Sequence, residues 1–222
     1  MKAIEFKNVS KTYLDGKEEF LALKSTNLAI ETGEFVAIIG PSGSGKSTFL
    51  TLAGGLQTPT EGEILINGQS IYQLSAKELG KIRFKEIGFI LQSSNLIPYL
   101  SVRNQFRLID KINKKSRQDE MEDLLAQLEI SGVADKYPED LSGGQKQRVA
   151  IVKALYNNPT LILADEPTAS LDSERAFEVV KILAKESKAK NKAIVMVTHD
   201  LRLIDQCDRV FEMSDGVLTE KK

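Results

Sequence analysis

Short apolar runs bounded by polar residues and glycines dominate the first third of the chain. Residues 34–39 read Glu-Phe-Val-Ala-Ile-Ile and lead directly into a glycine. A nearly continuous apolar run of this kind is typical of a strand that is buried on both faces. Similar runs predict further strands over residues 4–9, 27–30, 63–66 and 87–91.

The pattern changes between about Ser93 and Lys136, where the strand-like runs stop. Residues 118–129 carry apolar side chains at helical spacing, which predicts an amphipathic helix. These apolar positions are Met121, Leu124, Leu125 and Leu128. We interpret this part of the chain as a helical subdomain that is inserted into the strand-rich part. The Lys/Arg run of residues 111–117 is interpreted as a solvated face.

Strands and helices alternate again towards the end of the chain. Residues 161–164 and 193–197 predict short buried strands, and residues 173–188 between them predict a helix. A shorter helix is expected after Asp200. Strands that alternate with helices favour an α/β fold with a mainly parallel sheet.

The composition narrows the class of protein. Thirty Lys and Arg stand against thirty-one Asp and Glu, so the net charge of -1 gives no overall field to attract nucleic acid. A single cysteine, Cys207, excludes an internal disulfide and is interpreted as a packing residue; a single histidine, His199, excludes a multi-histidine metal site. Because no apolar run reaches membrane-spanning length, we expect a cytosolic chain that needs another polypeptide to act at a membrane.

A glycine-rich loop follows the strand over residues 34–39. Residues 40–48 read Gly-Pro-Ser-Gly-Ser-Gly-Lys-Ser-Thr and precede a predicted helix through Leu52, which matches the phosphate-binding P-loop pattern. Glycines let the backbone wrap a phosphate chain, and a helix N-terminus directs several N–H groups at the anion. Lys46 is expected to reach the β- and γ-phosphates, and the Ser47 hydroxyl is expected to ligate Mg²⁺.

Two adjacent carboxylates end the strand over residues 161–164. Asp165 and Glu166 come directly after four aliphatic residues, as in a strand whose carboxyl end faces a ligand crevice. Asp165 is expected to hold Mg²⁺, and Glu166 is expected to polarise the attacking water as general base. The alternative is a solvated strand end.

A second glycine pair predicts another anion site. In Leu141-Ser-Gly-Gly-Gln145, Ser142 and Gln145 have the spacing of a capping box, which predicts a helix through about Leu155. Gly143 and Gly144 leave the backbone bare where N–H groups point outward from a helix start. One chain would then carry two phosphate-binding helix starts. A simple kinase needs only one, whereas two chains that share a nucleotide between them would need both.

Taken together, the chain resembles the ATP-binding-cassette ATPases over essentially its whole length. The resemblance rests on the order of the motifs: the P-loop, Gln92 after a strand, residues 141–145, the acidic pair, residues 169–172 and His199. It implies a P-loop nucleotide-hydrolase core with an N-terminal antiparallel β region. It also implies a single domain over residues 1–222, with 1–92 and 156–222 as the nucleotide-binding core and 93–155 as the helical subdomain.

The resemblance also implies residue roles. Tyr13 would stack on adenine, Gln92 would sense Mg²⁺ and the attacking water, Asp172 would lie at a dimer interface, and His199 would contact the γ-phosphate. A surface tyrosine and a structural histidine are the plain alternatives. The residues expected to bind ATP are Tyr13, Gly40, Pro41, Ser42, Gly43, Ser44, Gly45, Lys46, Ser47, Thr48, Ser142, Gly143, Gly144, Gln145 and Asp172. Those expected to be catalytic are Lys46, Gln92, Glu166 and His199, and those expected to hold Mg²⁺ are Ser47, Gln92 and Asp165.

The expected partners are a second copy of the chain and a membrane permease. In the family, two subunits pair head to tail on ATP, so that ATP lies between the P-loop of one and Ser142–Gln145 of the other. Residues 93–105 look like the stretch that meets the permease, and they resemble the lipoprotein-release and macrolide-exporter branch. Many relatives have Gly followed by Asn or Ala at the positions of Ala169 and Ser170. The pair found here resembles Gram-positive haem-exporter ATPases more than the lipoprotein-release and macrolide-exporter branch.

The sequence is therefore interpreted as an ATPase subunit at the cytoplasmic face of a bacterial membrane. It would energise a separate permease, with export of haem or an antimicrobial peptide as the expected transport, and no nucleic acid is expected as partner. The alternatives are a non-transport ATPase of the cell-division type and a soluble iron–sulfur assembly ATPase. A stand-alone P-loop kinase is disfavoured by the motif at residues 141–145.

Overall fold

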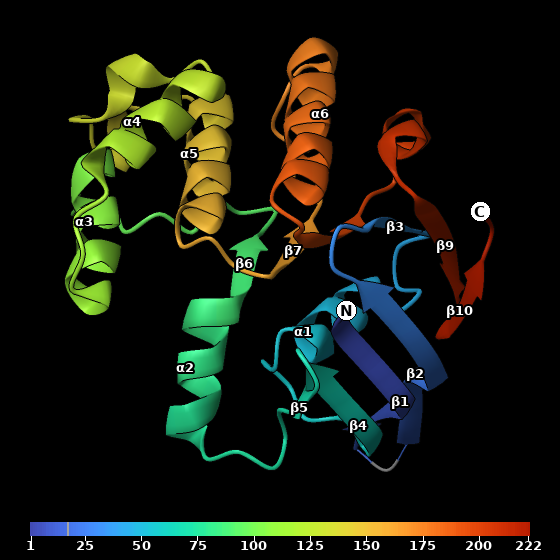
Figure 1. The fold of residues 1–222 in the computed structure, drawn as a ribbon. Helices are drawn as coiled ribbons and strands as arrows, with labels where there is room; N and C mark the ends of the chain where they lie inside the picture. The colour runs from blue at the N-terminus through green and yellow to red at the C-terminus, as the bar shows by residue number, and fades with distance from the viewer. Residues whose placement is uncertain (17) are drawn as a thin grey trace.

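A computed structural model describes residues 1–16 and 18–222 and contains a six-stranded sheet at its centre (Figure 1). The strands lie in the order β10-β9-β3-β8-β7-β6, and all neighbours are parallel except the antiparallel pair of β9 and β10. Their bounds are β3 Phe35–Ile39, β6 Ile87–Ile90, β7 Leu161–Asp165, β8 Ala193–Val197, β9 Arg209–Ser214 and β10 Val217–Glu220. The predicted mainly parallel sheet is confirmed.

A smaller antiparallel sheet lies beside the N-terminus, as expected. Its four strands lie in the order β2-β1-β4-β5, and the long hairpin of β1 and β2 pairs Tyr13 directly with Phe20. The bounds are β1 Lys2–Asp15, β2 Glu18–Glu31, β4 Glu61–Ile66 and β5 Gln69–Ser70. Asn67 and Gly68 both have positive φ and form the predicted turn between β4 and β5.

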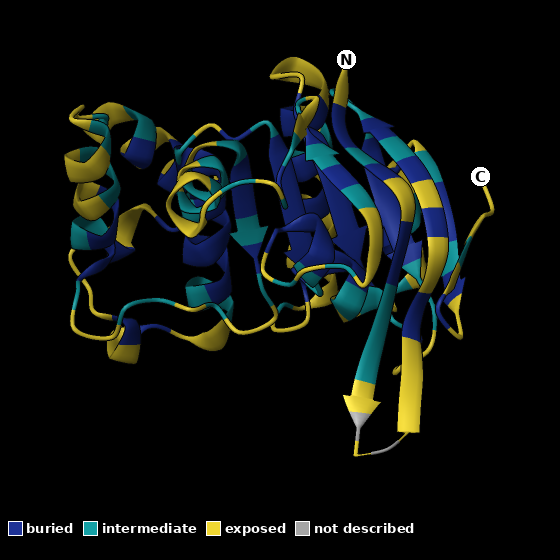
Figure 2. Ribbon diagram, turned by 90° about the horizontal axis from the view of Figure 1, so that it is seen from below, coloured by how far each residue is buried: buried dark blue, intermediate teal, exposed yellow. Residues whose placement is uncertain are grey.

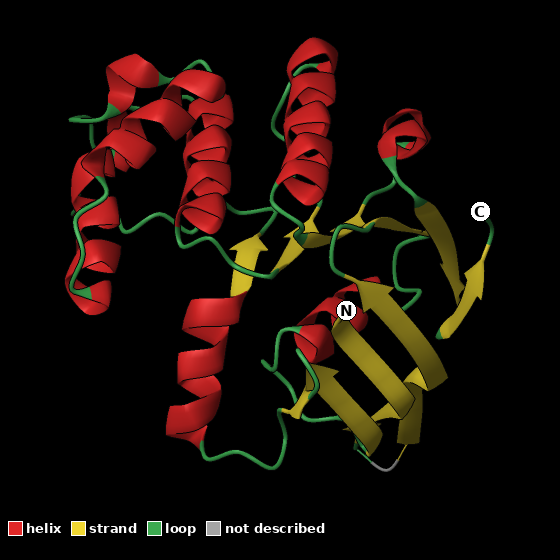
Figure 3. Cartoon of the chain, viewed as in Figure 1, coloured by secondary structure: helices red, strands yellow, loops and turns green. Residues whose placement is uncertain are grey.

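Helices surround the parallel sheet and extend to one side of it (Figure 3). Their bounds are α1 Lys46–Ala53, α2 Ala76–Glu86, α3 Val102–Asn113, α4 Gln118–Gln127, α5 Gly143–Tyr156 and α6 Ser173–Ala189, with 3-10 helices η1 Ser131–Val133, η2 Pro138–Asp140 and η3 Leu201–Gln206. The expected short helix after Asp200 is thus a 3-10 helix. None of the helices in the described part of the chain is both long and apolar enough to cross a membrane.

Two hydrophobic clusters lie on opposite faces of the parallel sheet. Figure 2 colours the strands at the centre of the molecule largely as buried. Along β3, Phe35 and Ala37 belong to one cluster, and Val36 and Ile38 belong to the other. This alternation explains the continuous apolar run, because both faces of the strand need apolar side chains. The first cluster joins α3, α4, α5 and α6 to the sheet, and the second joins α1 and the antiparallel sheet to it.

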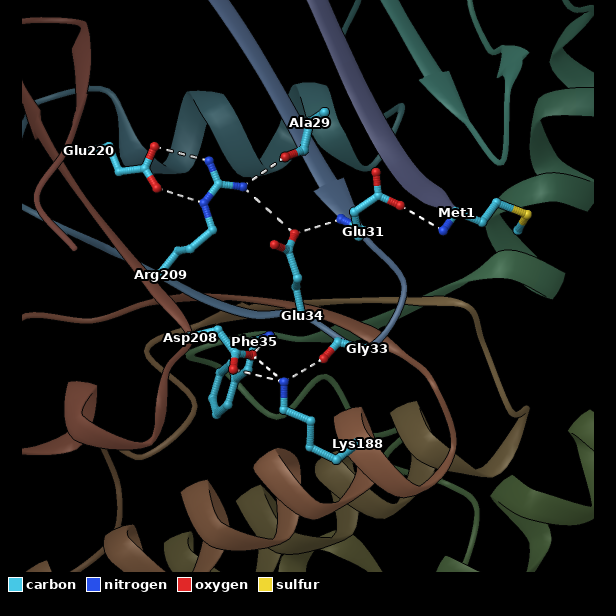
Figure 4. A network of polar contacts seen from close by, with 10 residues as sticks. All are labelled: Met1, Ala29, Glu31, Gly33, Glu34, Phe35, Lys188, Asp208, Arg209 and Glu220. Atoms are coloured by element: carbon cyan, nitrogen blue, oxygen red, sulfur yellow. Dashed lines mark hydrogen bonds and ion pairs between the residues drawn. The ribbon is translucent and has the colours of Figure 1, made fainter.

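A polar network fastens the amino end of β3 to neighbouring elements (Figure 4). The Asp208 carboxylate accepts a hydrogen bond from the Phe35 backbone N–H at 2.8 Å. It also forms an ion pair with Lys188 of α6 at 2.7 Å. Arg209 contacts Glu220 of β10 at 2.7 Å and the Ala29 carbonyl of β2 at 2.9 Å. The network fixes one end of β3, and the glycine-rich loop follows its other end.

Candidate nucleotide-binding site

The glycine-rich loop leaves β3 through backbone conformations that other residues rarely adopt. Gly40 has φ 145°, and a Cβ there would lie 2.2 Å from the Met213 carbonyl oxygen. Gly45 has φ 108°, and a Cβ there would lie 2.4 Å from the Ala22 carbonyl oxygen. Both glycines are therefore required by contacts within the chain, and the loop is clamped between β9 and β2.

Lys46 lies at the first position of α1 and folds back over this loop. Its Nζ donates to the carbonyl oxygens of Gly40 at 2.8 Å and Pro41 at 2.7 Å. The Ser44 hydroxyl is buried within the loop and has no hydrogen-bond partner among the described residues. An ammonium group, an unsatisfied hydroxyl and a helix N-terminus together fit a phosphate chain.

The loop forms one wall of a cleft of about 530 Å³. The cleft brings together predicted residues from both sheets and from four loops, because the parallel strands β3, β6, β7 and β8 all end at this edge. The predicted residues that line it are Tyr13, Gly40, Ser42, Gly43, Gly45, Lys46, Ser47, Thr48, Gln92, Asp165, Glu166 and His199.

Two carboxylates lie on the wall opposite the loop. Burial raises the pKa of Asp165, and repulsion from Glu166 raises it further, while the charge of Lys46 acts in the opposite direction. Glu166 has φ 47°, which is uncommon for a residue with a side chain, and its N–H donates to the Val197 carbonyl at 3.0 Å. Half-buried carboxylates that repel each other provide the oxygen ligands that a divalent cation prefers.

His199 is in contact with one of these carboxylates. Its Nδ1 lies 2.8 Å from Glu166 Oε1, while the His199 side chain remains 76% exposed. The ring therefore contacts Glu166 with one nitrogen and leaves its other side open to the cleft. This geometry disfavours the plain alternative of a histidine that is packed inside the fold.

The far end of the cleft is aromatic. Tyr13 donates its hydroxyl hydrogen to Gln57, and the Lys11 Nζ lies 5.1 Å from the Tyr13 ring centroid. Phe20, directly opposite Tyr13 in the hairpin, also lines the cleft and is 58% exposed. Sequence reasoning missed Phe20, although the pairing of two aromatic residues across a hairpin could have indicated it.

The second glycine motif forms the helix start that its spacing predicted. The Gln145 N–H donates to Ser142 Oγ at 3.2 Å, and the Ser142 N–H donates to Gln145 Oε1 at 3.0 Å. A Cβ at Gly144 would lie 3.2 Å from a Leu171 methyl group, whereas nothing in the described chain lies within 4 Å of a Cβ at Gly143. Neither glycine lines the cleft described above.

Asp172 also lies outside this cleft. It caps α6 by accepting a hydrogen bond from the Arg175 N–H at 3.0 Å, and its carboxylate pairs with the Arg175 guanidinium at 2.7 Å. Its side chain is 53% exposed. The cleft therefore collects the strand-end residues and most of the P-loop. The predicted residues that do not line it are Pro41, Ser44, Ser142, Gly143, Gly144, Gln145 and Asp172.

One buried glutamine connects the segments that carry the reactive groups. Gln147 of α5 is 1% exposed, and its amide donates to the carbonyls of Leu91 at 3.2 Å and Pro167 at 3.0 Å. Leu91 precedes Gln92, and Pro167 follows Glu166. Sequence reasoning missed this residue, because a polar side chain two positions after a capping box gives no sign that it is buried.

A parallel sheet with a phosphate-binding loop and two carboxylates at its carboxyl edge defines a P-loop nucleotide hydrolase. The chain belongs to the ABC transporter family, whose model matches residues 23–169. It binds ATP and is an ATPase, the expected activity. The described residues have the fold of an ABC cassette, as expected.

Curated relatives match along almost their full lengths. The hemin import ATP-binding protein HrtA of Staphylococcus haemolyticus strain JCSC1435 is 44% identical over 219 residues, which cover 96% of this chain and 98% of the relative. The protein of the same name from Staphylococcus aureus strain MRSA252 is 42% identical over 221 residues, with 98% and 100% covered.

Solved structures of ABC cassettes superpose closely. The dimeric structure of MJ0796, a bacterial ABC transporter cassette, has a TM-score of 0.93 at 42% identity and covers 99% of this chain and 98% of its own. A dimeric post-hydrolysis state of MJ0796 bound to ADP and Pi has a TM-score of 0.92 at 41% identity, with the same coverage. CbiO1 of Clostridium perfringens has a TM-score of 0.83 at 31% identity, with 98% and 87% covered.

Proposed function

We propose that this chain is the ATPase subunit of a bacterial transporter and that two copies of it enclose ATP head to tail. The observation that carries the proposal is the separation of the two phosphate-binding segments. The cleft holds Lys46 and the carboxylates, but Gly143 faces open space with no steric or conformational need for glycine within its own chain. A bare backbone at that position is explained if a ligand held by a second copy approaches it.

In this arrangement each cleft residue has a role. Lys46 and the loop backbone bind the phosphates, and Tyr13 contacts the base. Glu166 accepts a proton from the attacking water, and His199, already 2.8 Å from Glu166, orients that carboxylate and contacts the terminal phosphate. Catalysis then depends mainly on positioning and charge stabilisation, as is usual for phosphoryl transfer.

Mg²⁺ fits the same edge of the cleft. Asp165, the Ser47 hydroxyl and Gln92 supply the oxygen ligands that this ion prefers, and all three line the cleft. Burial and repulsion from Glu166 raise the pKa of Asp165 even though the charge of Lys46 acts in the opposite direction, so a bound cation would stabilise this carboxylate. When bound, the ion would neutralise charge that develops on the phosphates.

A groove next to Gln92 supports docking to a membrane permease. It has a volume of about 270 Å³ and lies between Phe89 and Leu91 on one side and Ala150 and Lys153 on the other. The chain over residues 93–95 forms part of it, and Lys153 Nζ donates to the Asn95 carbonyl at 3.2 Å. A partner seated there would press on the segment that holds Gln92, which couples docking to the cleft.

The names of the relatives support haem as the cargo class. The proteins named HrtA from Staphylococcus carry the words hemin import, whereas our sequence-based expectation is export. Cargo would contact the permease rather than this chain, so the direction of transport stays a prediction. The permease would hold the chain at the cytoplasmic face of the membrane.

The test is the substitution Glu166→Gln. Loss of the general base is expected to lower ATP hydrolysis by roughly 10²–10³-fold while ATP binding is kept. Because hydrolysis would release the dimer, the variant is expected to elute as a stable dimer in ATP, and wild type as a monomer after turnover. The control Glu178→Gln, on an exposed position of α6, should behave as wild type. Normal hydrolysis by the Glu166 variant, or a monomer in ATP, would overturn the proposal.

A further inference from the structure

Helix α3 exposes apolar side chains on its outward face. It packs Val102 and Phe106 into the core, yet Leu108 is 41% exposed and Ile112, one helical turn later, is 57% exposed. In Figure 1, α3 lies at the outer edge of the helical group, away from both sheets. Two large apolar side chains on adjacent turns of an outer helix are unfavourable in water unless they meet a partner.

The same face is strongly basic. Residues 103–117 contain six Lys and Arg and a single Asp, in a chain whose net charge is -1. Two of the six are neutralised, because Arg103 pairs with Asp135 at 2.8 Å and Arg117 contacts Asp110 at 3.6 Å. The other four are exposed and form no ion pair with any residue of the described ranges: Arg107, Lys111, Lys114 and Lys115.

A polar hollow of about 520 Å³ adjoins this face. It lies where the ends of α2, α3 and α5 meet, and Lys85, Lys115 and Arg117 line it together with Glu86 and three asparagines. The Nε and Nη2 atoms of Arg117 are buried and lack a hydrogen-bond partner, although Nη1 donates to the Tyr156 carbonyl at 2.6 Å. Glu86 pairs with Lys85 at 3.0 Å, so the three cations that line the hollow outnumber its one carboxylate. The remaining positive charge fits an anionic group such as a phosphate.

We propose that the α3 basic face, formed by Arg107, Leu108, Lys111, Ile112, Lys114 and Lys115, binds the surface of an anionic phospholipid bilayer. Leu108 and Ile112 would enter the interface between headgroups and acyl chains, and the lysines would contact headgroup phosphates. The adjoining hollow would take one such headgroup. The chain would thus touch the bilayer directly, in addition to any permease.

The composition of the face favours lipid over an acidic protein segment. The four unpaired cations are spread over a convex helix and the turn after it, and three of them are lysines on long stems. The charged surface of a bilayer can be bound by lysines without a fixed arrangement of the cations. An acidic peptide, in contrast, is usually held by a groove and by bidentate arginines. An apolar stripe flanked by cations is also the pattern of helices that lie in a membrane interface.

Flotation with vesicles tests this inference on the purified full-length chain without a permease. Wild type is expected to float with equimolar phosphatidylglycerol and phosphatidylcholine, not with phosphatidylcholine alone, and less at high salt. Lys111→Gln with Lys115→Gln should weaken binding by about 25-fold, since each cation near an anionic surface contributes roughly fivefold. Leu108→Ser with Ile112→Ser should also weaken it, whereas ATP hydrolysis should be unchanged in both.

Matched controls lie on α6. Lys181→Gln with Lys185→Gln removes two exposed lysines that are also four residues apart in the sequence, and Phe177→Ser removes an exposed apolar side chain; both variants should float as wild type does. The inference is wrong if wild type binds neither kind of vesicle or binds both equally. It is also wrong if the lysine double variant of α6 loses as much vesicle binding as Lys111→Gln with Lys115→Gln. Binding only to vesicles that carry a permease would assign the face to a protein partner instead. None of these outcomes depends on the dimer tested with Glu166→Gln.

Discussion

The fold restricts the glycines of the P-loop but not Gly143 of the second glycine motif. Gly40 and Gly45 have positive φ and would clash with backbone carbonyls of their own chain if they carried a Cβ. Gly143 has neither restriction, because its φ is ordinary and the space around it is open. Substitution of Gly40 should therefore distort the loop itself, whereas substitution of Gly143 should leave the fold intact.

Phe20 offers a prediction about the base end of the cleft. Phe20→Ala should weaken ATP binding about fivefold, because an aromatic contact to the base adds roughly 0.5–1.5 kcal/mol. Binding of inorganic tripolyphosphate, which has no base, should not change. Titration calorimetry with both ligands measures this difference. Leu21→Ala, the next residue of β2 and 43% exposed, is the control; equal losses for ATP and tripolyphosphate would show that Phe20 acts only through the fold.

Sequence motifs predicted most of the cleft, because the backbone of a P-loop and the end of a buried strand have strict residue requirements. The sequence could not predict Phe20 or Gln147 as readily. Phe20 belongs to the cleft only because the hairpin register sets it opposite Tyr13, and Gln147 connects Leu91 to Pro167 across 56 and 20 residues of chain. Phe20 thus depends on the register of a local hairpin, whereas Gln147 depends on tertiary contacts that no local pattern shows.

At the scale of elements, strands were predicted better than helices. Each buried strand has an apolar run, because both faces of the sheet need apolar side chains. Helix α2 buries none of its residues fully, and only Leu79 and Ile82 pack partly against a hydrophobic cluster. Its capping box, formed by Ser75 and Glu78, is the local signal for it. Helix α3 shows no helical spacing of apolar residues in its sequence, because apolar residues lie on both its buried and its exposed faces.

The run at residues 111–117 was interpreted as a solvated face, and this interpretation is wrong for Arg117. Its side chain is only 20% exposed, and its guanidinium lies 4.3 Å from the centroid of the Tyr156 ring. A basic residue in such a run can pack on an aromatic ring of a later helix, and no local pattern reports this contact.

A buried lysine joins the starts of two neighbouring strands and gives a prediction for pH. Lys192, just before β8, is 2% exposed and donates to Asn158 Oδ1 at 2.5 Å, just before β7. Burial lowers the pKa of Lys192 from 10.5 to about 8. Between these values the unfolded chain binds more protons than the folded chain, so this lysine makes folding stability rise with pH across that window.

Lys192→Met should abolish this contribution. Between about pH 7 and about pH 10, the free energy of unfolding of wild type should gain roughly 1–3 kcal/mol relative to that of the variant. Urea unfolding at the two pH values measures the difference between the proteins, and Lys185→Met, at an exposed position, should match wild type. Parallel pH profiles for wild type and Lys192→Met would contradict the prediction.

At the scale of the whole molecule, the two edges of the parallel sheet differ. Polar contacts hold strands at the amino-end edge, and the cleft lies at the carboxyl-end edge. Asp208, Lys188 and Arg209 tie the amino ends of β3 and β9 to α6, β2 and β10 (Figure 4), while the loops at the carboxyl ends of the strands line the cleft. The predicted division at residues 93–155 stays a prediction, although α3, α4 and α5 share one hydrophobic cluster with the sheet.

Because nothing in the described chain lies within 4 Å of a Cβ at Gly143, a residue there can be defective without harm to the cleft of its own chain. Two inactive variants are therefore expected to restore each other's ATP hydrolysis. Chains carrying Lys46→Ala and chains carrying Gly143→Asp should each be nearly inactive alone. Mixed in equal amounts, they should regain on the order of a quarter of the wild-type rate, because each heterodimer would combine both lesions in one pocket and leave the other pocket whole. A phosphate-release assay on the mixture, with the double variant as control, measures this recovery; no gain on mixing would mean that every chain hydrolyses ATP by itself.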